Sequence, residues 1–410
     1  IDFEGRPGLG VPGWPFDRAA LDPYYKRAAD SCQLNSTDFD DVATWQTRTG
    51  KASLDLPNDD IVTRFFLYSP PTRFGETYRD EVGKAANVTT YLNSNVLEIV
   101  PNAAASRIER LTIATLSGSR FEVRPRICIL ATGGIENARL LLTSDSVQTG
   151  GLANGRDLVG RYFMEHVTPP GQVAAIAATD ETLIPFYYIH TPTIGDVSMR
   201  AVFMPSDEYL RRTNRLGASL SIYEAHAPGD QTKGGDPRVE PAILEMLRSM
   251  GAANGPAGGM IYGVACAAEP QPSADNRVTL TGTRDALAMR EARLTWRPTQ
   301  AERESLYQNL MALARSFGAW QGAVKVAIPN QADWQDTEIG WGNHHMGTTR
   351  MASDPTQGVV DADCKAHGIA NLYIAGSSVF PSCGPVNPTL TIVALAMRLA
   401  DHLKAKGVQG

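Results

Sequence analysis

Two side-chain types suited to the chemistry of alcohols stand near the end of the 410-residue chain. A histidine pair, His344 and His345, lies in the string Gly-Asn-His-His-Met-Gly-Thr-Thr-Arg-Met, and Asn387 lies in the string Asn-Pro-Thr-Leu-Thr. An imidazole titrates near neutral pH and can accept a hydroxyl proton while hydride leaves the carbon. These residues therefore indicate the oxidation of an alcohol, although composition alone also allows a structural or chance His-His pair.

A strand, a glycine turn and a helix surround Asn387 in the sequence. The apolar run Leu372–Ala375 predicts a strand that ends in a turn at Gly376 and Ser377. A helix is expected to follow, with Asn387 as its cap and Pro388 in the first helical position. The capping role is an alternative to a catalytic role for Asn387, but both can hold, because a cap faces whatever lies at the helix end. The positive end of the helix would also stabilise negative charge placed there.

A similar succession of strand, turn and helix occurs earlier in the chain. Arg126–Ala131 is a short, nearly unbroken apolar run, as expected for a strand in a sheet covered on both faces. It continues through Thr132-Gly133-Gly134 into a helix that begins near Ile135. This order is half of a dinucleotide-binding unit, so this strand and Leu372–Ala375 could lie side by side in one sheet.

The spacing of these motifs closely resembles the C-terminal end of the glucose-methanol-choline (GMC) family of flavin oxidoreductases. The family's His-x-x-Gly-Thr pattern selects His344, followed by Gly347 and Thr348. The resemblance implies that FAD is the cofactor, that His344 is the base and that Asn387 hydrogen-bonds the substrate hydroxyl. It also makes His345 a candidate for substrate binding, as a second side chain is in some members, although adjacent side chains face different directions.

The same resemblance assigns a set of residues to FAD. The turn at 132–134 and the strand that holds Val96 correspond to the adenosine end, with ordinary fold turns as the alternative. The turn at 376–377 corresponds to the ribityl-diphosphate, although many members carry an acidic residue near this position. The expected cofactor-binding residues are Val96, Thr132, Gly133, Asn137, Gly376, Ser377, Pro388 and Thr389.

One glycine motif lies in the wrong context. Residues 8–13 match G-x-G-x-x-G, but that string binds a dinucleotide only between a buried strand and a helix. The preceding segment is short and charged, and Pro12 and Pro15 disfavour a helix, so we expect a surface loop. The GMC resemblance implies a pyrophosphate-binding βαβ unit ahead of residue 1. We therefore expect an N-terminal portion that was cleaved, belongs to a second polypeptide or lies outside this sequence.

The length of the chain exceeds what one hydrophobic core usually supports, so two lobes are expected. The fold class predicted is α+β / α/β, in which a FAD-binding dinucleotide-type lobe is interrupted by a substrate lobe with an antiparallel sheet. The expected divisions are 1–75 as a lead segment shared by both lobes, 76–160 as the first part of the FAD lobe, 161–345 as the substrate lobe, and 346–410 as the second part of the FAD lobe, with the active-site residues at the junction.

Hydrophobic alternation and turn residues predict the remaining elements. Expected helices cover 21–29, 237–250, 299–317 and about 388–403. Expected strands cover 88–92, 95–100, 107–116, 121–123, 173–177, 186–190, 197–203, 218–223, 261–267, 277–280 and 292–296.

Composition argues against several classes of protein. With 43% hydrophobic and 20% charged residues the chain is globular, and a net charge of -6 without a block of like charge indicates neither nucleic acid nor an anionic membrane as a partner. The five cysteines are scattered without a C-x-x-C pair, so no metal site or disulfide scaffold is expected. No apolar run approaches the ~20 residues of a membrane span. The sequence gives no prediction of localisation.

Together these features predict FAD-dependent oxidation of a secondary or hemiacetal hydroxyl on a sugar, polyol or glycoside. The sugar preference is a hypothesis that follows from the closeness of the chain to glucose- and pyranose-oxidising members of the family. Gly160–His166 also resembles a segment common in the sugar- and polyol-oxidising branch, and His166 itself is interpreted as structural. Hydride would pass to flavin N5, and the electron acceptor would be oxygen, a quinone or a redox protein. The alternatives are a non-redox lyase on the same fold and a non-catalytic subunit of a larger flavoprotein.

Overall fold

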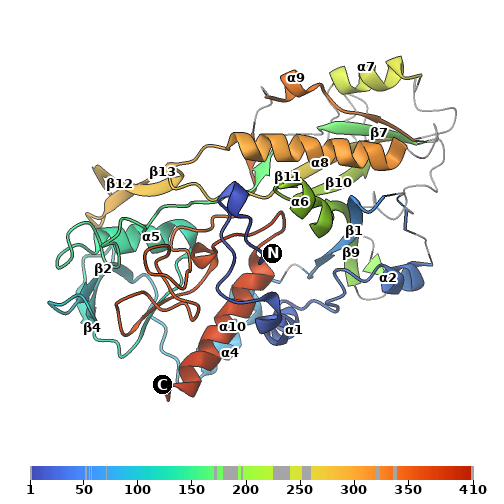
Figure 1. Cartoon of the computed structure of the whole chain (residues 1–410). Coiled ribbons are helices and arrows are strands. Elements are labelled where there is room, and N and C mark those ends of the chain that lie inside the picture. Colours follow the sequence, from blue (N-terminus) through green and yellow to red (C-terminus); the bar gives the residue numbers. More distant parts are fainter. Residues whose placement is uncertain are drawn as a thin grey trace.

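The computed structural model describes residues 2–50, 53–54, 56, 58–70, 72–169, 173–178, 193–194, 197–224, 241–251, 260–318, 324–335 and 339–407. These residues form two lobes side by side, each around its own hydrophobic core (Figure 1). One lobe carries the two glycine turns and the other an antiparallel sheet, so the fold class expected from the sequence is confirmed. None of the described helices combines the length and apolar character that a membrane crossing requires.

The first lobe is built around a short parallel sheet. Strands β5 (Cys128–Leu130) and β16 (Leu372–Ile374) lie side by side, as predicted. Helix α5 (Gly133–Thr143) follows β5, and helix α10 (Thr389–Ala405) follows β16 after a loop. Both helices bury apolar side chains in the core of this lobe. Because the strands are parallel, the turns that follow them meet at one edge of the sheet.

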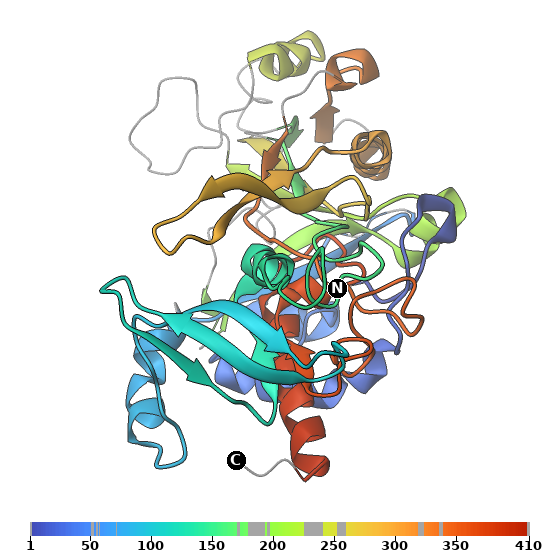
Figure 2. The ribbon, with the colours of Figure 1, turned by 90° about the vertical axis from the view of Figure 1, so that its left-hand side faces the viewer.

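A three-stranded antiparallel sheet packs beside α5 (Figure 2). Its strands are β2 (Asn95–Pro101), β3 (Ile108–Ala114) and β4 (Arg120–Val123), which confirms the predicted strand and hairpin. A separate hairpin, β12 (Arg277–Arg284) and β13 (Arg290–Thr295), covers α5 from another side.

The prediction that β5 is covered on both faces is wrong. Cys128 and Leu130 are buried, but Ile129 between them is 47% exposed. Within the described residues β5 pairs with β16 alone, and no helix covers the face that Ile129 occupies. The run of apolar residues was read as two-sided burial, whereas only one side of the strand meets the core.

The second lobe is a nine-stranded sheet among the described residues. Its central order is β1-β9-β10-β11-β6-β15, while β7 pairs with β11 and β14, and β8 pairs with β9. All of its pairs are antiparallel. The strands are β1 (Ile61–Tyr68), β6 (Val167–Thr168), β7 (Ala174–Ala178), β8 (Thr193–Ile194), β9 (Val197–Pro205), β10 (Ala218–Glu224), β11 (Met260–Ala268), β14 (Val324–Ala327) and β15 (Gly340–Trp341).

Alternation along these strands separates two faces of the sheet. On one face, Phe65 and Phe203 are buried in the core of this lobe beneath helix α8 (Gln300–Gly318). The rings of Phe203 and Phe317 of α8 meet edge-on with centroids 5.5 Å apart. The next residues along the strands, including Phe66, lie on the other face, which turns toward the first lobe and its His344 loop.

The lead segment contains more structure than the sequence predicted. Both β1 and helix α2 (Val42–Thr49) lie within residues 1–75 and were missed. Trp45 of α2 stacks near Phe65 of β1, with ring centroids 5.6 Å apart. The run Ile-Val-Thr-Arg-Phe-Phe-Leu-Tyr is rich in β-branched and aromatic residues and is typical of a strand. The prolines and glycines around it favour a loop, and for that reason no strand was predicted there.

The predicted strand at 88–92 is also wrong. Val88, Tyr91 and Leu92 are 46%, 65% and 77% exposed, and this stretch pairs with no described strand. A strand-like composition gives a strand only where a neighbour is available to pair with it. The predicted strand at 186–190 and residues 237–240 of a predicted helix lie outside the described residues; the helix itself is α7 (Pro241–Ser249).

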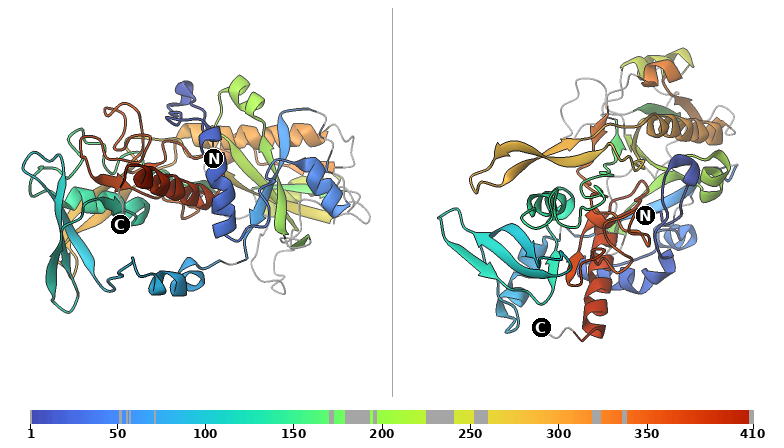
Figure 3. Two further views of the ribbon diagram at one scale, coloured as in Figure 1. Left: turned by 90° about the horizontal axis from the view of Figure 1, so that it is seen from below. Right: turned by 60° about the vertical axis from the view of Figure 1, so that its left-hand side comes forward.

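The remaining helices link the lobes or cap the sheets. Helix α1 (Asp22–Ser31) packs on α10, where the hydroxyls of Tyr25 and Thr391 are 2.9 Å apart. The G-x-G-x-x-G string at 8–13 begins within a single 3-10 turn, η1 (Pro7–Leu9), and opens no α-helix, which confirms the expected loop. Helices α3 and α4 bury no residue and run along the outside from one lobe to the other (Figure 3). These and the other short elements are η1 (Pro7–Leu9), η2 (Arg18–Ala20), α3 (Phe74–Thr77), α4 (Arg79–Lys84), α6 (Asp207–Thr213), α9 (Gln331–Gln335) and η4 (Ser377–Val379).

Candidate active site

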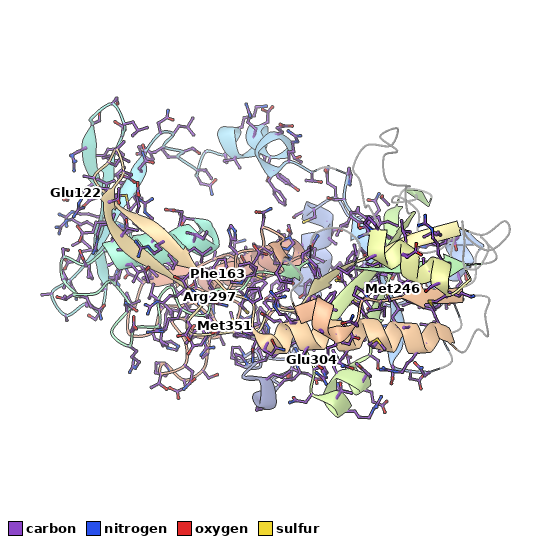
Figure 4. The ribbon with its side chains drawn as sticks, turned by 90° about the horizontal axis from the view of Figure 1, so that it is seen from above. Glu122, Phe163, Met246, Arg297, Glu304 and Met351 are labelled. Atoms are coloured by element: carbon purple, nitrogen blue, oxygen red, sulfur yellow. The ribbon has the colours of Figure 1, made fainter. Side chains whose placement is uncertain are left out.

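A cavity of about 220 Å³ lies where the polar face of the large sheet meets the His344 loop. Strands of the second lobe line it together with His344 and Asn387, so it lies where the two lobes meet, and ligand sites are common at such junctions. In Figure 4, the labelled Phe163, whose ring contacts the neighbouring His345, lies near the middle of the molecule. The cavity is lined by Phe66, Tyr68, His166, Thr168, Arg200, Ser219, Ser221, Tyr223, Ala265, Cys266, Ala267, Gly342, His344, Pro385 and Asn387.

A buried carboxylate fixes the backbone of the His344 loop. Glu165 is 2% exposed, and the backbone N–H of His344 donates to both of its oxygens at 2.9 Å. The N–H groups of His166 and Gly342 also donate to Glu165 Oε1, at 2.8 and 3.3 Å. Hydrogen bonds to a carboxylate are strong, so Glu165 fixes the backbone from which the His344 side chain extends.

The ring of His344 makes a hydrogen bond to a second histidine, His166. Their Nδ1 atoms are 2.9 Å apart, and Nε2 of His166 is 3.0 Å from the carbonyl oxygen of Gly384. A carbonyl only accepts, so His166 carries its proton on Nε2 and offers Nδ1 as an acceptor. His344 then donates from Nδ1, which leaves its Nε2 without a proton. This assignment follows from the hydrogen-bond network.

Electrostatics keep both imidazoles neutral. Burial, assisted by His344, lowers the pKa of His166 to about 4, so His166 is uncharged at neutral pH. Burial also lowers the pKa of His344 from its usual value, and the neighbouring His345 adds to this, while Glu165 acts in the opposite direction. A neutral His344 with an unprotonated Nε2 is in the form that a general base requires.

Asn387 lines the same cavity as His344, and its side chain is exposed. The prediction that it caps helix α10 is wrong by one residue, because Pro388 occupies the cap position and Thr389 is the first helical residue. No side chain caps the first N–H groups of α10. The amide of Asn387 is thus not consumed by capping and is available at the cavity.

His345 does not line this cavity. Its ring lies against Phe163 with centroids 5.6 Å apart, and its Nε2 is 3.8 Å from Glu165 Oε2. The carbonyl of His345 accepts a hydrogen bond from Ser377 Oγ at 2.7 Å. The two adjacent histidines therefore face different surroundings, and the candidate role of His345 in binding substrate has no support in this geometry.

The His344 loop is held against both glycine turns. Gly347 donates its backbone N–H to the carbonyl of Ser377 at 3.1 Å, and Thr348 donates its hydroxyl to the carbonyl of Gly134. A Cβ on Gly134 would lie 2.3 Å from the carbonyl oxygen of His345, so only glycine permits this close approach. The His344 loop and the two glycine turns are consequently joined in one assembly by hydrogen bonds and close packing.

The two turns present open backbone at one edge of the parallel sheet. Gly133 has φ 91° and Gly376 has φ 104°, and a Cβ at either position would meet no atom within 4 Å. Helix α5 begins at the first turn, and like α10 it has no side-chain cap. Unpaired N–H groups at helix N-termini bind phosphate and other anionic groups, so this edge has both the space and the donors for such a ligand.

Asn137 joins the two turns from inside the protein. It is fully buried, its Oδ1 accepts from the N–H and hydroxyl of Thr132, and its Nδ2 donates to Ser378 Oγ and to the carbonyl of Ala375. The hydrogen-bonding capacity of its side-chain amide is therefore used within the chain, and a direct contact between Asn137 and a cofactor stays a prediction. Asn137 holds the turns in register with each other.

Replacing Asn137 with alanine is expected to lower the free energy of unfolding by about 1–3 kcal/mol, because buried donors and acceptors lose their partner. The variant should also bind cofactor more weakly, since the two turns lose their link.

The matched control is Asn371→Ala. Asn371 is 2% exposed and joins Ile108 to Arg126 away from the turns, so its loss should destabilise the fold without a change in cofactor affinity. Thermal unfolding of both variants measures the loss of stability, and titration with FAD measures the affinity for cofactor. An equal loss of FAD affinity in the two variants would contradict the linking role of Asn137.

The other predicted residues lie at the edges of this assembly. Val96 is on β2, opposite Ile113, and does not line the cavity. Thr132 is the cap position of α5, while Pro388 and Thr389 open α10. Their contact with a cofactor stays a prediction. Glu165, the role of His166 and the cavity contacts of the sheet residues were not predicted. For the sheet residues, the alternation that predicts strands at 197–203, 218–223 and 261–267 was the available sequence signal.

Known proteins resemble this chain in sequence and in fold. Residues 272–396 match the family model described as GMC oxidoreductase. The chain is 28% identical over 319 residues to a 2-methyl-1,2-propanediol dehydrogenase of Mycolicibacterium austroafricanum, covering 72% of this chain and 50% of that protein. It is also 28% identical over 325 residues to a fructose dehydrogenase large subunit of Gluconobacter japonicus, covering 75% of this chain and 54% of that subunit. The chain thus spans about half the length of these curated relatives.

Solved structures show the same fold. The crystal structure of pyridoxine 4-oxidase from Mesorbium loti superposes with a TM-score of 0.54 and 17% identity, covering 94% of this chain and 70% of that one. A structure concerned with FAD modification in Aspergillus oryzae formate oxidase gives a TM-score of 0.53 and 15% identity, covering 96% and 72%. Residues 272–396 thus match the GMC oxidoreductase model, and the chain shares the fold of these two solved oxidases.

FAD is the cofactor that the match to the GMC oxidoreductase model implies. The residues fit it at one place, the edge formed by the turns at Gly133 and Gly376. Both glycines leave open space where a side chain would stand, and the N-termini of α5 and α10 offer unpaired N–H groups. The loop that carries His344 is hydrogen-bonded to both turns, so this edge and the cavity share one structural element.

Proposed function

We propose that the protein oxidises a secondary or hemiacetal hydroxyl of a sugar, polyol or glycoside, with FAD as cofactor. The observation that carries the proposal is the pair His344 and His166, in which the hydrogen-bond network leaves Nε2 of a neutral His344 free to accept a proton. Relatives named as a polyol dehydrogenase and a fructose dehydrogenase support a hydroxyl-bearing substrate.

The chain's own residues have separate tasks in this reaction. His344 accepts the hydroxyl proton at Nε2, and the amide of Asn387 holds the same oxygen so that the carbinol carbon is oriented for transfer. His166 keeps the acceptor nitrogen of His344 unprotonated, and Glu165 keeps its backbone in place. When bound, FAD supplies the acceptor of the hydride at its N5 atom. The N-terminus of α10 would stabilise negative charge that develops beside it.

The test uses the FAD-carrying protein under anaerobic conditions. The protein is mixed separately with each member of a panel of hexoses, polyols and glycosides. At least one compound is expected to bleach the flavin absorption in a single turnover. Reoxidation by dioxygen and by a soluble quinone, measured in parallel, separates an oxidase from a dehydrogenase. If the compounds bind but none bleaches the flavin, oxidation is excluded, and a non-redox reaction on this fold takes its place.

The rate of flavin reduction should depend on the ionisation of His344. Protonated His344 cannot accept the hydroxyl proton, so the rate falls as pH decreases through its pKa. Because burial lowers that pKa, the fall is expected below pH 6.5, the ordinary value for histidine, and the rate should be level from there to pH 8. Stopped-flow reduction between pH 4.5 and 8.5 measures this profile. A midpoint above pH 6.5 would contradict the assigned surroundings of His344.

A further inference from the structure

Arg200 stands in the middle of the polar sheet face that lines the cavity. It lies on β9, directly opposite Phe66 of β1, with Tyr223 of β10 on its other side. Its guanidinium carbon is 5.9 Å from the ring centre of Phe66, 6.0 Å from that of Tyr68 and 4.9 Å from that of Tyr223. Three aromatic rings thus hold this cation in one orientation.

The guanidinium has hydrogen-bonding capacity that the described residues do not use. Nη1 donates to the hydroxyl of Tyr223. Nε of Arg200 is buried and has no hydrogen-bond partner in the part of the chain that the structure describes, and no described carboxylate forms an ion pair with it. Arg64, on the neighbouring strand β1, differs in this respect, because its Nε is 3.1 Å from Asp40.

None of the described residues that line the cavity offsets the charge of Arg200. They include no aspartate or glutamate. His166 and His344 both have lowered pKa values and are neutral near pH 7. Burial raises the pKa of Tyr68, so its hydroxyl does not become a phenolate there. A positive charge in a partly desolvated cavity without a counter-ion is costly, and a ligand that brings the opposite charge removes that cost.

We propose that Arg200 binds a carboxylate on the substrate, so that the cavity selects a sugar acid, a polyhydroxy compound with one carboxylate, over its neutral counterpart. The inference rests on the proposed function and specifies its substrate class. A single guanidinium, with no second lysine or arginine among the described lining residues, suits one negative charge better than a phosphate. The serines and small alanines of the same face, Ser219, Ser221, Ala265 and Ala267, leave room for hydroxyl groups. A cavity of about 220 Å³ suits a single sugar unit rather than a larger ligand.

Matched ligands test the proposal on the FAD-carrying protein. Glucose and glucuronate differ only in a hydroxymethyl or carboxylate group, as do glucitol and gluconate. Calorimetric titration is expected to give a dissociation constant about 10- to 100-fold lower for the acid of at least one pair. Arg200→Gln should abolish the preference and Arg200→Lys should keep part of it, because lysine retains the charge but not the planar fork. Arg64→Gln is the control that should keep the preference in full.

Equal affinity of wild-type protein for acid and neutral partner in both pairs would overturn the proposal, as would an undiminished preference in Arg200→Gln. A change in the oxidised flavin spectrum of ligand-free Arg200→Gln, with the preference intact, would show that Arg200 faces the cofactor instead. Thermal unfolding of each variant reports whether it is folded. Binding and flavin bleaching are separate readouts. If the acid is preferred in an Arg200-dependent way but no compound bleaches the flavin, the carboxylate site is supported and oxidation is rejected. If neutral sugars bleach the flavin and the acid is not preferred, oxidation is supported and the carboxylate site is rejected.

Discussion

Replacing His344 with alanine is expected to slow anaerobic flavin reduction by about 10²–10⁴-fold, the usual contribution of a positioned general base. The substrate should still bind, because the sheet face of the cavity is unchanged and the backbone of residue 344 can still donate to Glu165. The loss should therefore fall on the reduction rate at saturating substrate rather than on affinity. Stopped-flow reduction across a range of substrate concentrations separates the two.

His345→Ala is the matched control for this variant. The two histidines are adjacent, but only His344 lines the cavity, so removing His345 should leave the reduction rate within a few-fold of wild type. If His345→Ala is as slow as His344→Ala, the imidazole that accepts the proton has been assigned to the wrong residue.

Replacing His166 is expected to have the second largest effect, although His166 is not itself the base. It fixes the tautomer of His344 by accepting the proton of Nδ1, and in catalytic triads an incorrect tautomer costs up to about 10⁴-fold in rate. We expect His166→Gln to slow flavin reduction by roughly 10²–10³-fold, because glutamine can replace the Nε2 contact with Gly384 but leaves Nδ1 of His344 without an acceptor.

His166→Asn provides the comparison that separates positioning from mere packing. Its amide oxygen reaches the place of the lost Nδ1 and can accept from His344, so a large part of the rate should return although the contact with Gly384 is gone. Equal losses in the glutamine and asparagine variants would indicate that His166 serves packing alone. The pH profile of flavin reduction provides a second readout. Its shape should change more in His166→Gln, in which Nδ1 of His344 has no acceptor, than in His166→Asn.

Much of the first lobe was predictable because its signals are local. The apolar runs at 126–131 and 372–375, each followed by a glycine, gave two strands and their turns, and their parallel pairing is confirmed. The helix after Asn387 was displaced by one residue, since Asn and Pro are both common at helix starts and sequence alone does not order them. Val88–Leu92 failed because a strand depends on a partner that the segment itself does not specify.

The organisation of the site depended on contacts that sequence spacing does not reveal. His166 and His344 are far apart in the chain, and an isolated histidine carries no sign of the carbonyl or imidazole it will meet. Arg200 acquires its surroundings only because the sheet register places Phe66 opposite it. Asn137 was correctly associated with the turn at 132–134, but its burial, which makes it a link between turns, depends on the strand pairing.

The measurement that tests the central claim most directly is single-turnover flavin reduction with a substrate deuterated at the carbinol carbon, using wild-type protein and His344→Ala. The account predicts that flavin bleaching is slower with the deuterated substrate and much slower again in the variant, because hydride leaves that carbon while His344 takes the proton. Bleaching at one rate in both proteins, or no bleaching by any hydroxyl-bearing substrate that binds, would contradict it.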